Sequence, residues 1–149
     1  MTIKLTGATA FTIENVNVSV DLTTSVEPVL EYTAGEDLPA KSVICQGESD
    51  SKVYLAKADS WTTMPAIGIT KGAVSADESV WVYQIGKVTS VRREADFGYD
   101  DKIFVSPDTA GKATKTPPET TGNIVQSLGR AVGVSDISLE IDHTCLEIA

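Results

Sequence analysis

The sequence contains little of what most catalytic and metal sites require. Among its 149 residues there is one histidine, His143, and there are two cysteines, Cys45 and Cys145, with no CxxC pair and no spacing typical of metal ligands. We therefore expect no metal, no other cofactor and no enzymatic activity. The N-terminus lacks a basic segment followed by an apolar run, so we expect no secretory signal and two reduced, buried thiols, with a disulfide as the alternative.

Basic residues are also scarce. Twelve lysines and arginines stand against 21 acidic residues, which gives a formal net charge of −9. A nucleic-acid-binding protein needs a dense basic face, and binding to anionic lipid needs the same, so we expect neither partner. No segment approaches the ~20 consecutive apolar residues of a membrane-spanning helix.

The motifs of common enzyme classes are missing as well. The sequence has no GxSxG elbow, no P-loop and no GxGxxG. His143 and Cys145 are two residues apart on a strand-like tail, but nothing nearby would orient the base or activate the thiol. Neighbouring carboxylates such as Asp100 and Asp101 lie in turn-like contexts, and solvated turns explain them better than paired acid–base catalysis.

Short alternating and β-branched segments recur along the chain, each bounded by Gly, Pro, Asp or Ser. They predict an all-β fold, a small barrel or sandwich of short antiparallel strands. We expect a strand at 11–20, with a bulge near Glu14. Further strands are predicted at 28–32, 42–46, 52–56, 66–70, 79–85, 87–91, 102–106, 124–134 and 137–141.

Two details within these segments carry expectations of their own. Gly68 interrupts an apolar strand, which is typical of a bend or of a close backbone approach. Trp81 and Tyr83 alternate with Val80 and Val82, so each pair shares one strand face. We expect the aromatic pair to face the core.

The composition changes near Thr33. Residues 1–33 contain no arginine and a single lysine, and they are rich in threonine and valine, with asparagine at 15 and 17. This predicts two parts, an N-terminal β-rich arm over 1–33 and a β-barrel domain over 34–149.

Several segments occur in an order that is typical of one known family. They are TAGEDLPAKSVICQ, KVYLAKADSWTTMPAIGIT, SVWVYQIGKVTSV, GYDDKIFVSPDTAGKATKTPP, NIVQSLGRAVG and ISLEI. Over roughly residues 33–142 the chain resembles the short bacteriophage capsid decoration, or cement, proteins. It departs from that family in the turn at 39–42, where a glycine is usual, in the longer and more charged segment 92–101, and in the first 33 residues.

The resemblance implies a small β-barrel that binds the outer surface of the expanded phage head. It implies a homotrimer that ties neighbouring subunits of the major capsid protein together, made in the bacterial cytoplasm and located on the virion. It brings no catalytic residue and no cofactor.

Candidate contact residues lie in the arm and in the charged segment. In the arm they are Ile3, Leu5, Phe11 and Ile13. These residues would add to the sheet edge of a neighbour, or alternatively complete the core of this chain. In the charged segment, Arg92 and Arg93 would pair with capsid carboxylates beside Phe97, or alternatively form a solvated turn.

Trp61 has two interpretations, because a tryptophan in a loop either covers the end of a barrel or contacts a partner. The second interpretation supports an alternative function, a receptor- or glycan-binding module of a phage tail or head fibre. Aromatic residues that would line a glycan groove are Trp61, Trp81, Tyr54, Tyr83, Phe97, Tyr99 and Phe104.

Overall fold

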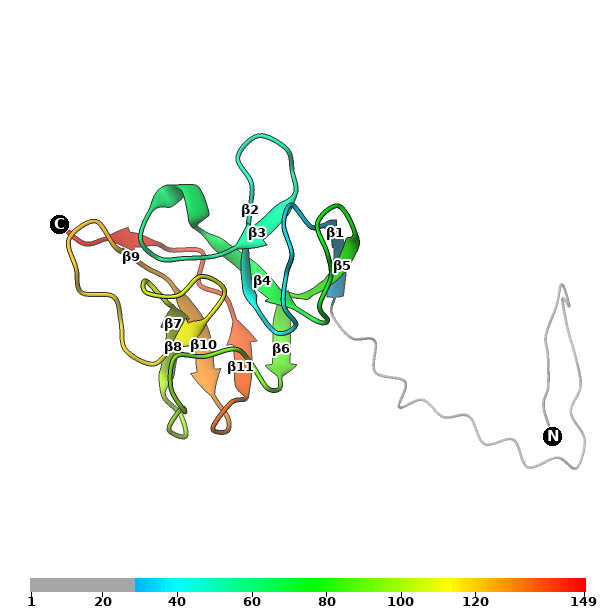
Figure 1. The fold of residues 1–149 in the computed structure, drawn as a ribbon. Coiled ribbons are helices and arrows are strands. Elements are labelled where there is room, and N and C mark those ends of the chain that lie inside the picture. Colours follow the sequence, from blue (N-terminus) through cyan, green and yellow to red (C-terminus); the bar gives the residue numbers. More distant parts are fainter. Residues whose placement is uncertain (1–28) are drawn as a thin grey trace, which may run out of the picture.

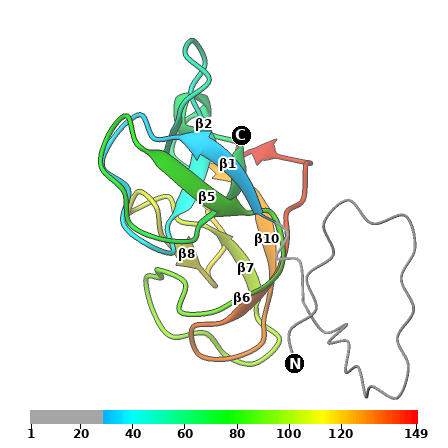
Figure 2. The same ribbon diagram turned by 90° about the vertical axis from the view of Figure 1, so that its right-hand side faces the viewer.

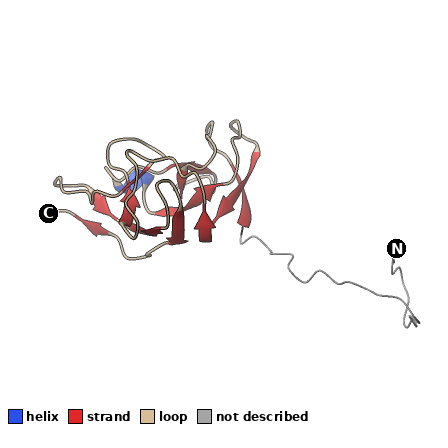
Figure 3. Cartoon of the chain, turned by 90° about the horizontal axis from the view of Figure 1, so that it is seen from below, coloured by secondary structure: helices blue, strands red, loops and turns tan. Residues whose placement is uncertain are grey.

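Twelve short strands and one 3₁₀ turn make up the computed structural model, which describes residues 29–149 (Figures 1 and 3). The elements are β1 (Val29–Thr33), β2 (Val43–Gln46), β3 (Val53–Leu55), η1 (Trp61–Thr63), β4 (Ala66–Thr70), β5 (Ser79–Tyr83), β6 (Ile85–Val88), β7 (Lys102–Val105), β8 (Ala113–Thr114), β9 (Ile124–Val125), β10 (Ser127–Ala131), β11 (Ile137–Glu140) and β12 (Leu146–Glu147). No helix within the described range is long and apolar enough to cross a bilayer.

Ten of the strands form two antiparallel sheets of five strands each. Sheet 1 has the order β1-β5-β4-β2-β3, and sheet 2 has the order β6-β11-β10-β7-β8. A short ribbon, β12-β9, lies beside them at the C-terminal end (Figure 1). The all-β prediction is confirmed, and the arrangement is a sandwich, because the sheets do not close into a barrel.

Sheet 1 is covered on both faces, which explains its continuous apolar strands. In β2, Val43 and Cys45 belong to the main core between the two sheets. Ile44, between them in the chain, belongs to a second core on the opposite face. The second core is completed by Leu38 and Val74 from the loops that lie over that face. Successive residues of one strand therefore pack into two different cores.

The predicted strands agree with the observed ones at most positions, apart from shifts of one to three residues at their ends. The segment 124–134 differs, because it contains two strands, β9 and β10, separated by Gln126. That side chain is buried and donates from its amide to the carbonyls of Ala66 and Asp142, at 3.1 and 3.0 Å. Its amide oxygen accepts from the Ala66 N–H at 2.7 Å. Gln126 therefore connects sheet 1 to the C-terminal segment.

The predicted N-terminal arm is described only over its last five residues. Val29–Thr33 is β1, which pairs along its length with β5 and so belongs to sheet 1. The expected contacts of Ile3, Leu5, Phe11 and Ile13 and the expected strand at 11–20 lie outside the described residues.

The expectation for Gly68 is confirmed. The pairing of β2 with β4 shifts register opposite Gly68. A Cβ on this residue would lie 2.4 Å from Val82 Cγ1 and 2.5 Å from the Tyr83 carbonyl oxygen. Glycine is required here because backbone and side chain of β5 approach it closely.

The expectation for Trp81 is wrong. Its side chain is 48% exposed, whereas Val80 and Val82 are buried in the second core. Tyr83, on the same strand face as Trp81, packs against the main core. The face shared by the two aromatic residues is therefore covered at Tyr83 and open at Trp81.

Both cysteines are free thiols. Cys45 is buried in the main core, and burial raises the pKa of its thiol to about 11. Cys145 is half-buried, and its thiol pKa is also raised, first by burial and then by the negative charge of Asp142. Both thiols are protonated at neutral pH and behave as small apolar groups.

Candidate binding surfaces

The charged segment 92–101 lies in the connection between β6 and β7 and is tied to the loop before β2 and to β8. The Arg92 N–H donates to the Lys41 carbonyl at 3.0 Å, and the Arg92 carbonyl accepts from Ala113 at 2.9 Å. The Arg92 guanidinium donates to Ser42 Oγ at 3.1 Å, and Ser42 is fully buried. These hydrogen bonds of the half-buried Arg92 attach the segment to the rest of the domain. This role is neither the predicted pairing with a capsid carboxylate nor the predicted solvated turn.

Arg93 is engaged within the same segment. Its guanidinium donates to the carboxylate of Asp96, with Nε at 2.9 Å from the acceptor oxygen. An exposed ion pair of this kind exchanges readily with a new partner, because its net stabilisation is small. For Arg93, both the contact with a capsid carboxylate and the alternative of a solvated turn stay predictions.

Phe97 is not a contact residue. It is 4% exposed and lies in the main core, and its N–H donates to the Val134 carbonyl at 3.0 Å. An apolar side chain within a charged loop is more stable buried than exposed, since burying it removes apolar surface from water. The prediction that Phe97 lies at a contact with the capsid is therefore wrong, because its side chain packs inside the main core.

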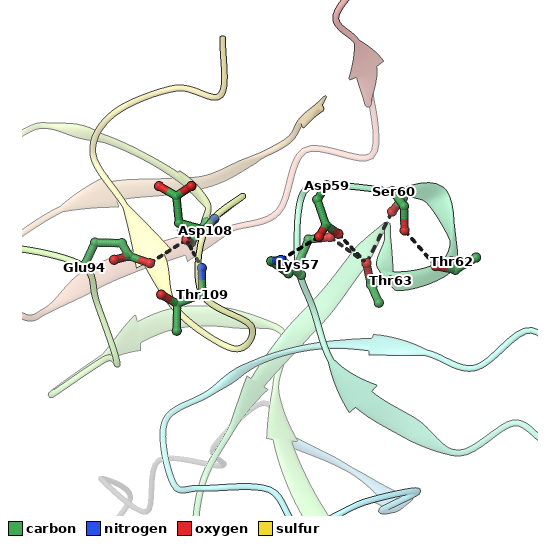
Figure 4. Close-up of polar contacts among 9 residues, drawn as sticks. Lys57, Asp59, Ser60, Thr62, Thr63, Glu94, Asp108 and Thr109 are labelled. Carbon is green, nitrogen blue, oxygen red and sulfur yellow. Dashed lines mark hydrogen bonds and ion pairs between the residues drawn. The ribbon is translucent and has the colours of Figure 1, made fainter. Parts of the chain in front are cut away.

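Glu94 ties the charged segment to the turn between β7 and β8 (Figure 4). Its carboxylate accepts from Ser106 Oγ at 2.6 Å. Ser106 Oγ in turn accepts from the N–H groups of Asp108 and Thr109, at 3.1 and 3.0 Å. The hydrogen bond from Ser106 is the main reason that the pKa of Glu94 is lowered below its ordinary value.

Tyr99 is the large apolar side chain that the segment presents to solvent, beside the exposed Glu94, Asp96 and Asp100. It is 84% exposed. The adjacent Asp100 N–H donates to the Ala131 carbonyl at 2.9 Å, which places the segment beside the turn between β10 and β11. Val132 and Val134 in that turn are 36% and 62% exposed. We call Tyr99, Val132 and Val134 the loop-end cluster.

A second exposed group contains Trp61 and Leu146, which we call the C-terminal cluster. Trp61 is 46% exposed and Leu146 is 64% exposed. The Trp61 Nε1–H donates to the Glu147 carboxylate at 2.7 Å, so the indole rests against β12. The loop before η1 is fixed by the ion pair between Lys57 and Asp59 and by the hydrogen bonds of Thr63 (Figure 4). Trp61 thus has an internal partner, Glu147, and a half-exposed ring. The first fits a residue that covers part of the fold, and the second fits a residue that contacts a partner.

A third exposed group lies at the β1 edge of sheet 1. Leu30 and Trp81 are 51% and 48% exposed and lie on the two faces of the β1–β5 pair, which lies nearest the viewer in Figure 2. We call them the edge cluster. Among the described strands, β1 pairs only with β5, and β6 only with β11. Both strands therefore present open edges of a kind that accept added strands.

The outer face of sheet 2 forms a groove of about 650 Å³ whose lining mixes polar side chains with the apolar Val132 and Ile141. Lys102, Ser127, Arg130, Ser138 and Glu140 line it from β7, β10 and β11. Tyr99 also lines it, as do Asp142 and His143 from the segment that follows β11. We call it the sheet 2 groove.

Sequence reasoning missed the loop-end cluster and most of this groove. Tyr99 entered only as one of several aromatic residues, and the two valines were placed inside a predicted strand. Gly133 between them was the available signal, because a glycine inside a strand pattern suggests an irregularity.

No group of three or more metal-ligating side chains comes together within residues 29–149. The sequence matches no protein-family model, and the curated proteins compared with it show no significant match.

Proposed function

We propose that this chain is a structural decoration protein that binds the outer surface of an expanded phage head. As a homotrimer it would hold neighbouring subunits of the major capsid protein together. The observation that supports the proposal best is the distribution of exposed apolar side chains. They are spread over different parts of a small body: near β12, on both faces of the β1–β5 pair, on β6 at Ile85, and at the loops below β7 and β10 in Figure 1.

The separation of these clusters favours a protein that joins several neighbours. A protein that binds one small ligand needs one site, whereas a cement protein needs a surface for each subunit that it touches. Exposed apolar groups are common sites of protein–protein contact. When linked contacts act together, avidity rises by about 10²–10⁴ over a single contact, which resists internal pressure without any chemical step.

The rigidity of the scaffold supports the same function. Arg92 and Glu94 fasten the charged segment to buried Ser42 and Ser106. Sheet 1 is packed on both faces. A partner-binding surface that is already ordered loses little conformational entropy on binding, so more of the contact energy appears as affinity.

The net charge fits the outside of a capsid. At −9, the chain is repelled by packaged DNA and by anionic surfaces. The open edges of β1 and β6 offer further contacts through main-chain hydrogen bonds.

The test is a sedimentation assay. Purified protein is mixed with undecorated expanded heads and, separately, with unexpanded procapsids of the same phage, and the copies that pellet with each shell are counted. We expect saturable binding to expanded heads at a fixed ratio to the major capsid protein, and a solution mass three times that of one chain. Binding to neither shell, together with binding to host cells, would replace this function with the receptor-binding alternative.

Variants locate the contact. We expect Tyr99→Ala, Trp81→Ala or Leu146→Ala to weaken head binding, since each removes an exposed apolar side chain without touching either core. Thr62→Ala, a change at an exposed polar residue beside Trp61, is the matched control and should bind as the parent does. Unchanged binding in all three apolar variants would contradict the proposed use of the clusters.

A further inference from the structure

We propose that the sheet 2 groove is a binding site for a neutral oligosaccharide. The groove shares Tyr99 and Val132 with the loop-end cluster and is separate from the C-terminal and edge clusters; the inference itself does not depend on capsid binding. Its volume of about 650 Å³ lies within the range of about 300–1,000 Å³ that is usual for small-ligand sites.

The centre of the groove is kept low by small residues. Ser127, Gly129 and Ser138 line it on the central strand β10 and its neighbour β11. Gly129 has φ +131°, and a Cβ there would lie 2.0 Å from the Ser138 carbonyl oxygen. The bulge in β10 therefore requires glycine at this position, and no side chain rises from it into the groove.

The polar groups around this centre are held in place before any ligand arrives. The Arg130 guanidinium donates to the Asp100 carbonyl at 3.1 Å and lies 3.5 Å from its carboxylate. The Asp142 N–H donates to the Ser127 carbonyl at 2.9 Å, and the buried Gln126 amide donates to the Asp142 carbonyl. Both walls of the groove are therefore tied to the sheet.

The chemistry of the lining selects the class of ligand. Lys102 and Arg130 are donors, Glu140 and Asp142 are acceptors, and the serine hydroxyls do both. Sugar hydroxyls also donate and accept, so a polyhydroxylated ligand satisfies all of these groups at once. Tyr99, 84% exposed at the side of the groove, provides an aromatic face for the apolar face of a sugar ring.

The same lining disfavours other small ligands. The groove carries the positive charges of Lys102 and Arg130 against the negative charges of Asp100, Glu140 and Asp142. A polyanion would meet a net negative surface on a chain that is itself acidic. A wholly apolar ligand could use Val132 and Ile141 but would also strip water from the charged groups of the lining without replacing their hydrogen bonds, which is costly.

The experiment is a titration of the full-length, ¹⁵N-labelled protein followed by amide resonances. The probes are linear neutral oligomers of α-1,4-glucose, β-1,4-glucose, β-1,4-N-acetylglucosamine and α-1,6-mannose, with a heparin oligomer and polyphosphate as anionic comparators. We expect at least one neutral oligomer to shift the amides of Gly129 and Ser138 saturably. Oligomer concentrations of about 10 mM suffice to detect a Kd of about 1 mM.

Two variants separate the groove from the rest of the surface. Tyr99→Ala should weaken the binding of that oligomer about tenfold or more. Trp81→Ala, which removes an exposed aromatic side chain outside the groove, should leave the Kd unchanged. The proposal is overturned if no neutral oligomer binds, if only the anionic probes bind, or if the shifts cluster around Trp61 and leave the groove unchanged.

Discussion

Replacing Phe97 by alanine tests whether the charged segment is held to the body by an internal apolar contact. Phe97 is 4% exposed and belongs to the main core. A buried phenylalanine removes about 150–250 Å² from water. At roughly 25 cal/mol per Å², that burial stabilises the fold by about 4–6 kcal/mol as an upper bound. Since truncations of buried phenylalanine cost about 3–5 kcal/mol, we expect Phe97→Ala to lower the free energy of unfolding by about 3–4 kcal/mol.

The assay is urea unfolding of the full-length protein, followed by the fluorescence of its two tryptophans. The free energy of unfolding is extrapolated to water, and the slope against urea concentration is compared with that of the parent. The same loss should appear as a fall in Tm of roughly 10–15 °C. Typical domains have a stability of about 5–15 kcal/mol, so the variant would keep its fold with a reduced margin.

Two further variants make the result decisive. Tyr99→Ala changes a residue two positions away that is 84% exposed, and its stability should stay within about 0.5 kcal/mol of the parent. Phe97→Leu keeps an apolar side chain and should cost about 1–1.5 kcal/mol. A loss below about 1 kcal/mol for Phe97→Ala, with an unchanged slope, would refute the core assignment and restore Phe97 as a candidate partner contact.

Three other predictions follow from the backbone, the thiols and the carboxylates. Gly129→Ala should cost about 3 kcal/mol or more, because φ is +131° and the new Cβ would meet main-chain atoms of β11; Gly72→Ala, with open space around it, should be neutral in the same urea assay. Ellman's reagent should modify the half-buried Cys145 in the native protein and reach buried Cys45, whose thiol pKa is raised to about 11, only after unfolding. The pKa of the Glu94 carboxyl is lower in the folded protein than in the unfolded chain, so as the pH falls this group is protonated at a higher pH in the unfolded chain. Its contribution to stability is therefore fully present above the ordinary carboxyl pKa of 4.5 and is lost as the pH falls through the lower folded value. Glu94→Gln should reduce the fall in stability between neutral pH and about pH 3, and identical pH profiles for variant and parent would contradict this.

Most of the strands were predictable because each carries its own local signals, whereas the two-residue strands β8 and β12 were not predicted. The segment Ala66–Thr70 was placed at its observed bounds, and the glycine within it was assigned a close backbone approach that the structure contains. Alternating or continuous apolar residues between turn-forming residues identify a strand without knowledge of its partners. The choice between a barrel and a sandwich was not predictable in the same way, because it depends on which strands pair.

The facing of β5 could not be predicted from alternation. Alternation identifies the buried face only when the other face meets solvent. Here Val80 and Val82 pack into the second core, while Tyr83 packs against the first. Both faces of β5 therefore carry apolar residues. The sequence pattern does not show at which residue of the strand each face stops being covered by a core. Trp81 is exposed because it lies on a face that is covered only in part.

The charged segment shows why contact residues are harder to predict than strands. A run of charges predicts a solvated loop, yet Arg92 and Glu94 hydrogen-bond to serines that are buried. Ser42 lies 50 residues before Arg92, so no local pattern could have connected the two. The residue that remains free to meet a partner is identified only after these internal contacts are known. The most exposed large apolar side chain of this segment is that of Tyr99, and both the head-binding and the oligosaccharide experiments therefore include its replacement.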